Sequence, residues 1–186
     1  MSGGHGHVEG SNKKIALLVA ILAALLAVSE MGGKSSQTNS LASHIDASNL
    51  WSFFQSKTIR QTTLRTAAEE VEAAYKDGPA PMPSALQAQA ERWRQTAQRY
   101  DTEPETGEGR KELAARAKVK ETQRDRSLSA YHMFEYGSAC FQLAIVLAGA
   151  AALTSVIWLT FLSIGLGALG FAFTVLAFVA PTLIHL

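Results

Sequence analysis

Hydrophobic residues gather in two stretches of this chain, and most of the polar residues lie between them. Residues 136–186 contain no Asp, Glu, Lys or Arg, and residues 15–29 form a second, shorter run without charge. Neither run alternates between apolar and polar positions, as the strands of a membrane barrel would. A helix needs about 20 largely apolar residues to cross the hydrocarbon core of a membrane. The pattern therefore predicts an all-α protein with three transmembrane helices.

The C-terminal run, residues 136–186, is long enough for a hairpin of two membrane helices. We expect the second span at Ala139–Leu159 and the third at Phe161–Pro181. The turn between them, at Thr160–Ser163, must be short because no charged residue marks it. Trp158 is expected to anchor this turn, since Trp side chains favour the interface between membrane and water.

The N-terminal run admits two interpretations. Residues 15–28 follow two lysines and resemble the apolar core of a cleavable signal peptide. The run is lengthened to span length by Met31 and the two glycines after it, and lysine side chains can reach the interface from within a span. We therefore interpret residues 13–33 as a retained membrane helix. Residues 1–12, which are rich in glycine, are expected to form a disordered tail.

Residues 34–135 are expected to form a soluble helical domain between the first and second spans. Helix-breaking residues at 78–83 and an acidic loop at 101–109 divide it into three helices. The first is expected to be capped by Asn39 and Ser40.

The second helix of this domain has one apolar seam at steps of 4 and 3, which is typical of a coiled coil. The seam consists of Leu86, Ala90, Trp93, Ala97 and Tyr100. The third helix begins at Arg110 and has no breaker before Gly137, so we expect it to continue into the second span. These features predict a coiled-coil-like stalk inserted between two spans.

Small residues recur at helical spacing in each predicted span, which is typical of membrane helices that pack closely. The stripe in the third span is the most distinct, and it consists of Ser163, Gly167, Gly170, Thr174 and Ala177. The first two spans have stripes at Ala16, Ala20, Ala23 and Ala27, and at Cys140, Ala144, Ala148, Ala151 and Ser155. Such stripes serve contacts within one chain or between chains, and we favour contacts within the chain.

Large aromatic residues cluster near the start of the soluble domain. Trp51, Phe53 and Phe54 lie within four residues, so they cannot share one stripe of a helix. They can form the core of the domain, contact the membrane surface or bind a partner. Trp and Arg are common anchors of protein interfaces, and Arg60 and Arg65 follow the aromatic cluster. We take these five residues as the candidate contact with a partner protein.

Motifs that would carry chemistry are weak in this chain. Residues 165–170 match the G-x-G-x-x-G pattern without the preceding strand that a nucleotide site needs. His132 and Glu135 lie one helical turn apart, but a metal would need further ligands. Residues 139–184 contain no Asp, Glu, Lys, Arg or His, whereas active transporters normally keep such residues inside the membrane. We therefore predict a non-enzymatic protein with no cofactor, no metal and no small-molecule substrate.

The charge balance also bears on partners. The chain has 17 Lys and Arg and 16 Asp and Glu, for a net charge of +1. No clustered basic face is evident, so nucleic acid is not an expected partner. Lys13 and Lys14 favour a cytoplasmic N-terminus and an external soluble domain, whereas basic residues before the second span favour the reverse. We give the first helix more weight.

Three stretches resemble an uncharacterised family of bacterial membrane proteins, the domain of unknown function 4337. They are NKKIALLVAILAALLAVSE (Asn12–Glu30), ASNLWSFFQSKTIRQT (Ala47–Thr62) and the longer stretch Glu103–Ala148. The resemblance covers nearly the whole chain. It implies a bacterial inner-membrane protein with this three-span layout, and it implies no reaction, substrate or cofactor.

Together these observations predict a scaffold, assembly factor or accessory subunit of a larger membrane complex. The expected partners are membrane lipid and either a protein or further copies of the same chain. A homo-oligomeric channel or passive pore is the alternative. A periplasmic soluble domain follows from the charges around the first span.

Overall fold

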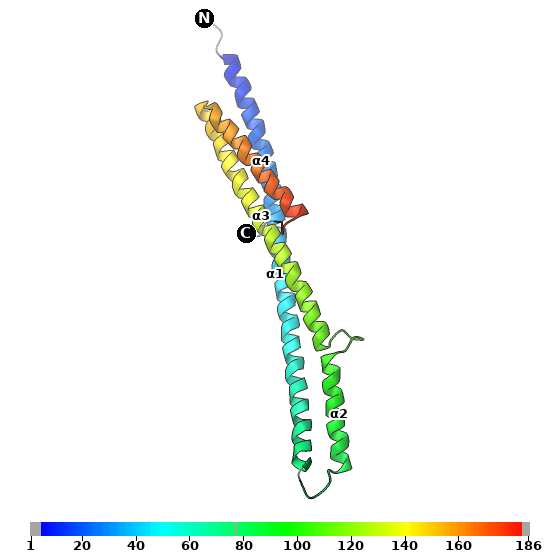
Figure 1. Cartoon of the computed structure of the whole chain (residues 1–186). Coiled ribbons are helices and arrows are strands. Elements are labelled where there is room, and N and C mark those ends of the chain that lie inside the picture. The colour runs from blue at the N-terminus through cyan, green and yellow to red at the C-terminus, as the bar shows by residue number, and fades with distance from the viewer. Residues whose placement is uncertain (1–4, 77, 184–186) are drawn as a thin grey trace. The chain divides into compact units, whose positions relative to one another are not determined.

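The structure is a computed structural model, which describes residues 5–76 and 78–183, with side chains from Lys13 onward. These residues form four α-helices and no strand, which confirms the predicted all-α class (Figure 1). The helices are α1 (His5–Lys76), α2 (Ser84–Asp101), α3 (Arg110–Thr154) and α4 (Ile157–Val179). The chain divides into two compact units. Unit 1 comprises Met1–Leu41 and Arg124–Leu186, and unit 2 comprises Ala42–Gln123.

Helix α1 has no break between the predicted membrane segment and the predicted soluble helix. It begins at His5, so residues 5–12, which were expected in a disordered tail, are helical; residues 1–4 lie outside the described part of the chain. The expected helix start at Asn39 and Ser40 is wrong. The hydroxyl of Ser40 instead donates a hydrogen bond to the carbonyl oxygen of Arg124 in α3, at 3.3 Å.

Two glycines in α1 allow α3 to approach it closely. A Cβ atom added to Gly32 would lie 2.6 Å from the ring of Phe134, and one added to Gly33 would lie 3.3 Å from the Cβ of Phe134. The aromatic ring occupies the space that side chains at these positions would need. Both glycines lie inside α1 and do not end it. They mark a contact between α1 and α3 in unit 1.

Unit 2 is an antiparallel helical hairpin. The chain reverses direction after α1 and returns as α2, the loop Thr102–Gly109 and the first part of α3 (Figure 1). The seam predicted for α2 lies on its packed face. Ala90 and Ala97 are buried, and Leu86, Trp93 and Tyr100 are partly buried. The returning chain thus packs along α1 in two successive helical segments.

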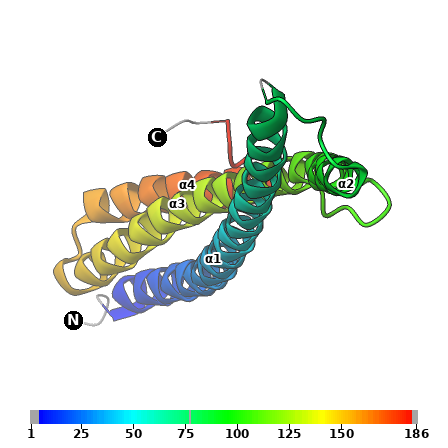
Figure 2. The same cartoon turned by 90° about the horizontal axis from the view of Figure 1, so that it is seen from below.

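Unit 1 contains α4, the N-terminal part of α1 and the C-terminal part of α3, which lie side by side (Figures 1 and 2). Its core has three apolar clusters, centred on Ile15 with Ala148, on Leu22 with Phe141, and on Met133 with Phe134. Many large apolar side chains of this unit are exposed, such as Phe161, Phe178 and Val179 in α4.

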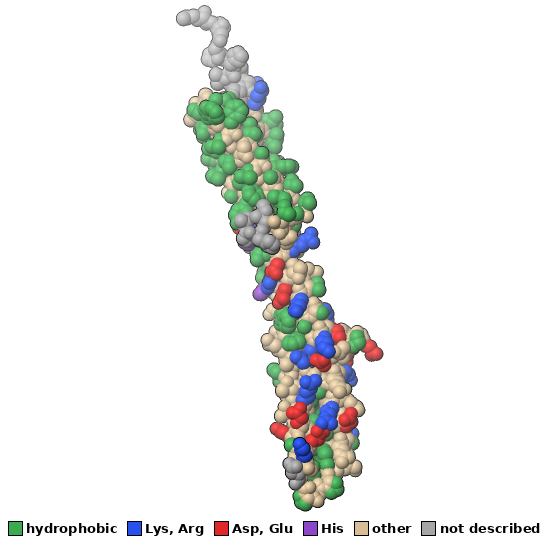
Figure 3. Space-filling model, in the orientation of Figure 1, with side chains coloured by type: hydrophobic (Ala, Val, Ile, Leu, Met, Phe, Trp, Pro, Cys, Tyr) green, Lys and Arg blue, Asp and Glu red, His purple; other side chains and the backbone are tan. Residues whose placement is uncertain are grey.

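Apolar and charged side chains separate between the two units. Hydrophobic side chains cover α4 and the neighbouring parts of α1 and α3, whereas Lys, Arg, Asp and Glu gather over unit 2 (Figure 3). Three helices, α1, α3 and α4, are long enough and apolar enough to cross a membrane. Their number agrees with the three spans that the sequence predicts.

The turn between the last two spans lies earlier than expected. Helix α3 ends at Thr154 and α4 begins at Ile157, so the predicted turn at Thr160–Ser163 is wrong. The prediction assumed two spans of equal length in the apolar run, which placed the turn too far along the chain. The chain instead turns at Ser155, whose φ of 58° is left-handed and ends the helix. Trp158 is 77% exposed in the first turn of α4.

The predicted role of the alanine stripe in the first span is also wrong. Ala16, Ala20, Ala23 and Ala27 are all exposed, and the packed face of α1 in unit 1 instead carries Ile15, Leu22 and Ser29. In the second span Ala144, Ala148 and Ala151 are buried as expected, whereas Ser155 is exposed at the turn. The chain therefore uses two of its three small-residue stripes internally.

Candidate functional site

The most distinctive polar site of unit 2 lies where α2 ends and α3 begins, opposite α1. At its centre is Lys57 of α1, of which only 6% is exposed. Its Nζ atom lies 3.4 Å from an oxygen of Glu103 and 3.7 Å from an oxygen of Glu108. The rings of Phe53 and Tyr100 each have their centroid 5.3 Å from the same Nζ atom, a distance at which a cation and an aromatic face attract. The buried charge is therefore paired on several sides.

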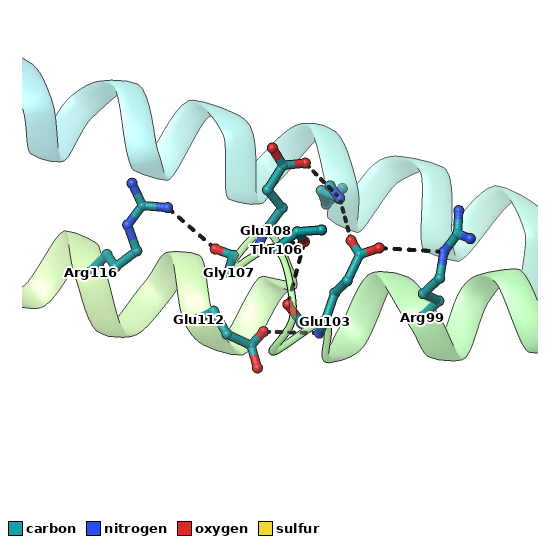
Figure 4. A network of polar contacts seen from close by, with 8 residues as sticks. Arg99, Glu103, Thr106, Gly107, Glu108, Glu112 and Arg116 are labelled. Carbon is teal, nitrogen blue, oxygen red and sulfur yellow. Dashed lines mark hydrogen bonds and ion pairs between the residues drawn. The ribbon is translucent and has the colours of Figure 1, made fainter.

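The loop that supplies these carboxylates is held by hydrogen bonds to side chains of α3 (Figure 4). The backbone N–H of Glu103 donates to the carboxylate of Glu112 at 3.3 Å, and Arg116 donates to the carbonyl oxygen of Gly107 at 3.3 Å. Gly107 has a φ of 67°, a conformation that glycine adopts without strain. Both carboxylates therefore come from a loop whose backbone is tied to α3.

A second cation, Arg110, closes the site from the first turn of α3. Its guanidinium donates to the hydroxyl of Thr58 at 2.9 Å and to the side-chain oxygen of Gln61, and it lies 5.0 Å from the ring centroid of Phe54. Gln61, which is 2% exposed, donates to the carbonyl oxygen of Ala97 at 2.9 Å. Polar contacts thus fill the junction between α1, the last turns of α2 and the first turn of α3.

Asp101, the last residue of α2, adds a carboxylate at the edge of this junction. It pairs with Lys111 at 2.9 Å and with Arg110 at 3.4 Å. The hydrogen bond from Lys111 lowers the pKa of Asp101 below its ordinary value of 3.8, and the charges of Lys111 and Arg110 act in the same direction. This carboxylate therefore remains ionised at all but strongly acidic pH.

Sequence reasoning missed Lys57 and Gln61, although their spacing offers a signal. The positions Phe54, Lys57, Gln61, Leu64 and Ala68 follow steps of 3, 4, 3 and 4 along α1. A lysine and a glutamine on such a seam indicate a polar layer in a coiled-coil-like core. What the spacing does not reveal is the loop that meets them.

The five residues predicted to contact a partner do not form one surface. The indole N–H of Trp51 donates to Glu121 at 2.8 Å, and its ring meets that of Phe54 edge-on, with centroids 5.4 Å apart. Trp51 and Phe54 therefore serve the packing of unit 2. Phe53 is 37% exposed, and Arg60 and Arg65 are exposed. These three are exposed, whereas Trp51 and Phe54 are half-buried.

The small-residue seam of α4 lies entirely on the packed face of that helix in unit 1, where Ser163, Gly167, Gly170, Thr174 and Ala177 are all buried. The hydroxyl of Ser163 donates to the carbonyl oxygen of Ala144 at 2.7 Å, and Thr174 donates to that of Gly170 at 2.9 Å.

A further polar contact joins all three helices of unit 1. The hydroxyl of Ser29 in α1 donates to the carbonyl oxygen of Phe134 in α3 at 3.0 Å. Thr174 of α4 lies 3.2 Å from the same hydroxyl. Sequence reasoning missed Ser29, which it treated as the end of an apolar run. Hydrogen bonds of this kind are a recurrent contact between membrane helices.

A groove of about 490 Å³ lies in unit 1 between α1 and α3, where charge gives way to apolar sequence. It is lined by Glu30 and Lys34 of α1 and by Tyr131, Glu135 and Gln142 of α3, among others. The amide of Gln142 lies 3.5 Å from Glu30, and the hydroxyl of Tyr131 donates to Glu135. Polar side chains therefore line this groove at the edge of the apolar segments.

The described residues contain no group of three or more His, Cys, Asp or Glu side chains arranged to hold a metal ion. His132 lies 3.4 Å from Glu135, and this pair makes an ordinary contact on the surface of α3. The glycine pattern at residues 165–170 lies within α4, so it has no loop geometry that could surround a phosphate.

Fold and site together define a class of protein, namely an all-helical chain with three helices suited to cross a membrane and a helical hairpin between the first two. The family model described as domain of unknown function (DUF4337) matches residues 11–180, so the chain belongs to that family. The chain matches none of the curated proteins and none of the solved structures with which it was compared.

Proposed function

We propose that this protein is a non-enzymatic membrane protein that acts as a scaffold, assembly factor or accessory subunit of a larger membrane complex. In this proposal residues 34–135 form a soluble, coiled-coil-like stalk that binds a partner protein. The observation that supports it best is the pair Phe53 and Arg60. Both side chains are exposed, and their separation of seven residues places them on one side of α1, two helical turns apart.

The adjoining side of this helix supports the same proposal. Lys57 and Gln61 are buried there and paired with the α2–α3 junction, which holds α1 in one orientation. An aromatic ring and a guanidinium on a fixed helix suit recognition, because little backbone freedom is lost on binding.

The alternative of a channel or passive pore has less support. The hydroxyl residues that would line a pore include Ser163 and Thr174. Both side chains are buried, and their hydroxyl groups form hydrogen bonds within one chain.

The experiment for this proposal is purification of the full chain in mild detergent, followed by mass spectrometry of the proteins that elute with it. The double variant Phe53→Ala and Arg60→Ala should lose a partner that the wild type retains. Lys118→Ala with Val119→Ala is the matched control, because it removes one basic and one apolar exposed side chain from α3. Equal recovery with the double variant, or no other protein with the wild type, would contradict the proposal.

The proposed location is a bacterial inner membrane, with the N-terminus in the cytoplasm and the stalk in the periplasm. Lys13 and Lys14 before the first span outnumber Lys34 after it, and positive residues favour the cytoplasmic side. A cysteine in place of the exposed Thr63, with Cys140→Ala, should react with a membrane-impermeant maleimide in cells whose outer membrane alone is permeable. Labelling only after the inner membrane is opened would reverse the orientation.

A further inference from the structure

The outer face of α1 in unit 2 is lined by uncharged side chains between positions 45 and 66. Positions at steps of 3 and 4 along this face are all exposed and all uncharged, and they are Ile45, Ser48, Ser52, Gln55, Ile59, Thr62 and Thr66. Two large apolar side chains are among them, since Ile45 is 50% exposed and Ile59 is 67% exposed. We call these seven positions the outer seam.

The other helices of unit 2 expose charge instead. On α2, exposed positions include Glu91, Arg92 and Arg99, and on α3 they include Lys111 and Lys118. The outer seam has the spacing of a coiled-coil interface without a helix against it. A shallow groove of about 560 Å³ follows it beside Ile59, Thr62 and Thr66, into which side chains of a facing helix would fit.

An independent observation comes from the part of α1 that lies in unit 1. Its stripe of Ala16, Ala20, Ala23 and Ala27 is exposed and takes no part in packing within the chain. Small residues at this spacing allow close approach of membrane helices, and those of α3 and α4 are used in that way. The same helix therefore carries an unused interface in each of the two units.

The charges beside the outer seam are complementary to those of a second copy of this chain. Copies of one protein insert into a membrane with one orientation, so their α1 helices run parallel. In a parallel pair with this register, Arg65 on one flank of the seam faces Glu70 on the other flank of the second helix, five positions further along. Both side chains are exposed. A two-fold axis forms this ion pair twice.

We propose that two copies of this protein associate in parallel through α1, with the outer seams of the two stalks in contact and Arg65 of each copy paired with Glu70 of the other. Few seam residues are large and apolar, so isolated stalks would associate weakly. Confinement to one membrane raises the effective concentration of the second copy and supports the contact.

Disulfide cross-linking in membranes tests the register. In the full chain with Cys140→Ala, single cysteines at Ile45, Ser52 and Ile59 should each cross-link to the same residue of a second copy under mild oxidation. Ala88→Cys, exposed on α2, and Lys118→Cys, exposed on α3, are the controls. Equal cross-linking of seam and control positions, or none at the seam, would overturn the proposal.

A charge exchange tests the ion pair. In the Ile59→Cys background, Arg65→Glu or Glu70→Arg alone should lower the cross-linked fraction by about fivefold, because each replaces two attractions by two repulsions. The double exchange should restore it. Cross-linking that is insensitive to the single changes, or that the double change fails to rescue, would exclude this register. Light scattering of the cysteine-free and wild-type proteins in detergent should give the same mass, which checks that Cys140→Ala leaves the protein unchanged.

This inference deepens the proposed scaffold function but can be judged separately. Loss of self-association with retention of a different co-purifying protein would leave the proposed function standing. Self-association without any other protein would remove the accessory role and leave the dimer.

Discussion

Gly137 of α3 and Gly170 of α4 face each other where these two helices pack together. A Cβ atom added to Gly137 would lie 3.1 Å from the carbonyl oxygen of Gly170, and one added to Gly170 would lie 2.9 Å from that of Gly137. Each glycine therefore lets the backbone of the other helix approach. The hydroxyl of Thr174, one turn further along α4, lies 2.7 Å from the Cβ position of Gly137.

The three glycines of α4 should respond differently to alanine. Gly170→Ala should lower the melting temperature most, because its Cβ meets backbone that cannot move aside; a cost of about 1 to 3 kcal/mol is typical of overpacking. At Gly167 the Cβ meets the end of the Leu22 side chain, at 2.7 Å, which can rotate. Gly165 has no atom within 4 Å of its Cβ position and is the control. In thermal unfolding in detergent, the loss of melting temperature should be larger for Gly170→Ala than for Gly167→Ala or Gly165→Ala. Equal melting temperatures would show that the seam is not a tight contact.

Substitutions at Gly32 and Phe134 should have coupled effects on stability. Gly32→Ala places a methyl group against the ring, so we expect destabilisation of about 1 to 3 kcal/mol. Adding Phe134→Leu should make Gly32→Ala less harmful, because a smaller side chain leaves room for the methyl group. A double-mutant cycle by thermal unfolding measures this coupling. Gly149, with nothing within 4 Å of its Cβ position, is the control, and additive effects of the two changes would refute the contact.

Lys57 should stabilise unit 2 through both its charge and its stem. Lys57→Ala removes a side chain that is only 7% exposed and leaves a space, so we expect a loss of about 2 to 3 kcal/mol. Lys57→Met keeps most of the volume, and Glu103 and Glu108 can turn toward water, so it should cost less. Thermal unfolding of both variants should be compared with the exposed control Lys118→Ala. A Lys57→Ala protein as stable as this control would show that the site adds nothing.

Asp101 should contribute stability that depends on pH. Because its pKa is lowered in the folded protein by Lys111, this contribution is present above the unfolded value near 3.8 and is lost as the pH falls through the lower folded value. Asp101→Asn should therefore reduce the melting temperature at pH 6 and have little effect near pH 2. Since the side chain is 32% exposed, the effect should be below about 1 kcal/mol. Glu105→Gln, exposed in the same loop, is the control. A difference that persists at pH 2 would assign the effect to something other than ionisation.

Several features of this protein follow from local sequence. The three apolar segments, the break after Lys76 and the start of α3 at Arg110 are readable because hydropathy, glycine and proline act on the chain where they stand. The apolar seam of α2 is readable for the same reason. One side of that helix is exposed to solvent and the other is packed, so polar and apolar residues alternate with the helical period.

The polar junction of unit 2 required the tertiary structure. Lys57 and Gln61 are buried because the chain breaks between α2 and α3, and the loop brings Glu103 and Glu108 to that gap. Spacing alone can indicate a polar layer on α1, but its partners are about 40 residues away in sequence. Trp51 was assigned to a partner surface for the same reason, since its hydrogen-bond partner Glu121 lies in another helix.

The packing of the three apolar helical segments was likewise decided only by the tertiary structure. All three predicted spans carry small-residue stripes, but the stripe of α1 is exposed, and Leu22 and Ser29 make the contacts instead. In a segment that is apolar on every side, hydropathy does not distinguish a face against lipid from a face against protein. Shape complementarity decides between them, and it depends on the facing helix, as the glycines at 137 and 170 depend on each other.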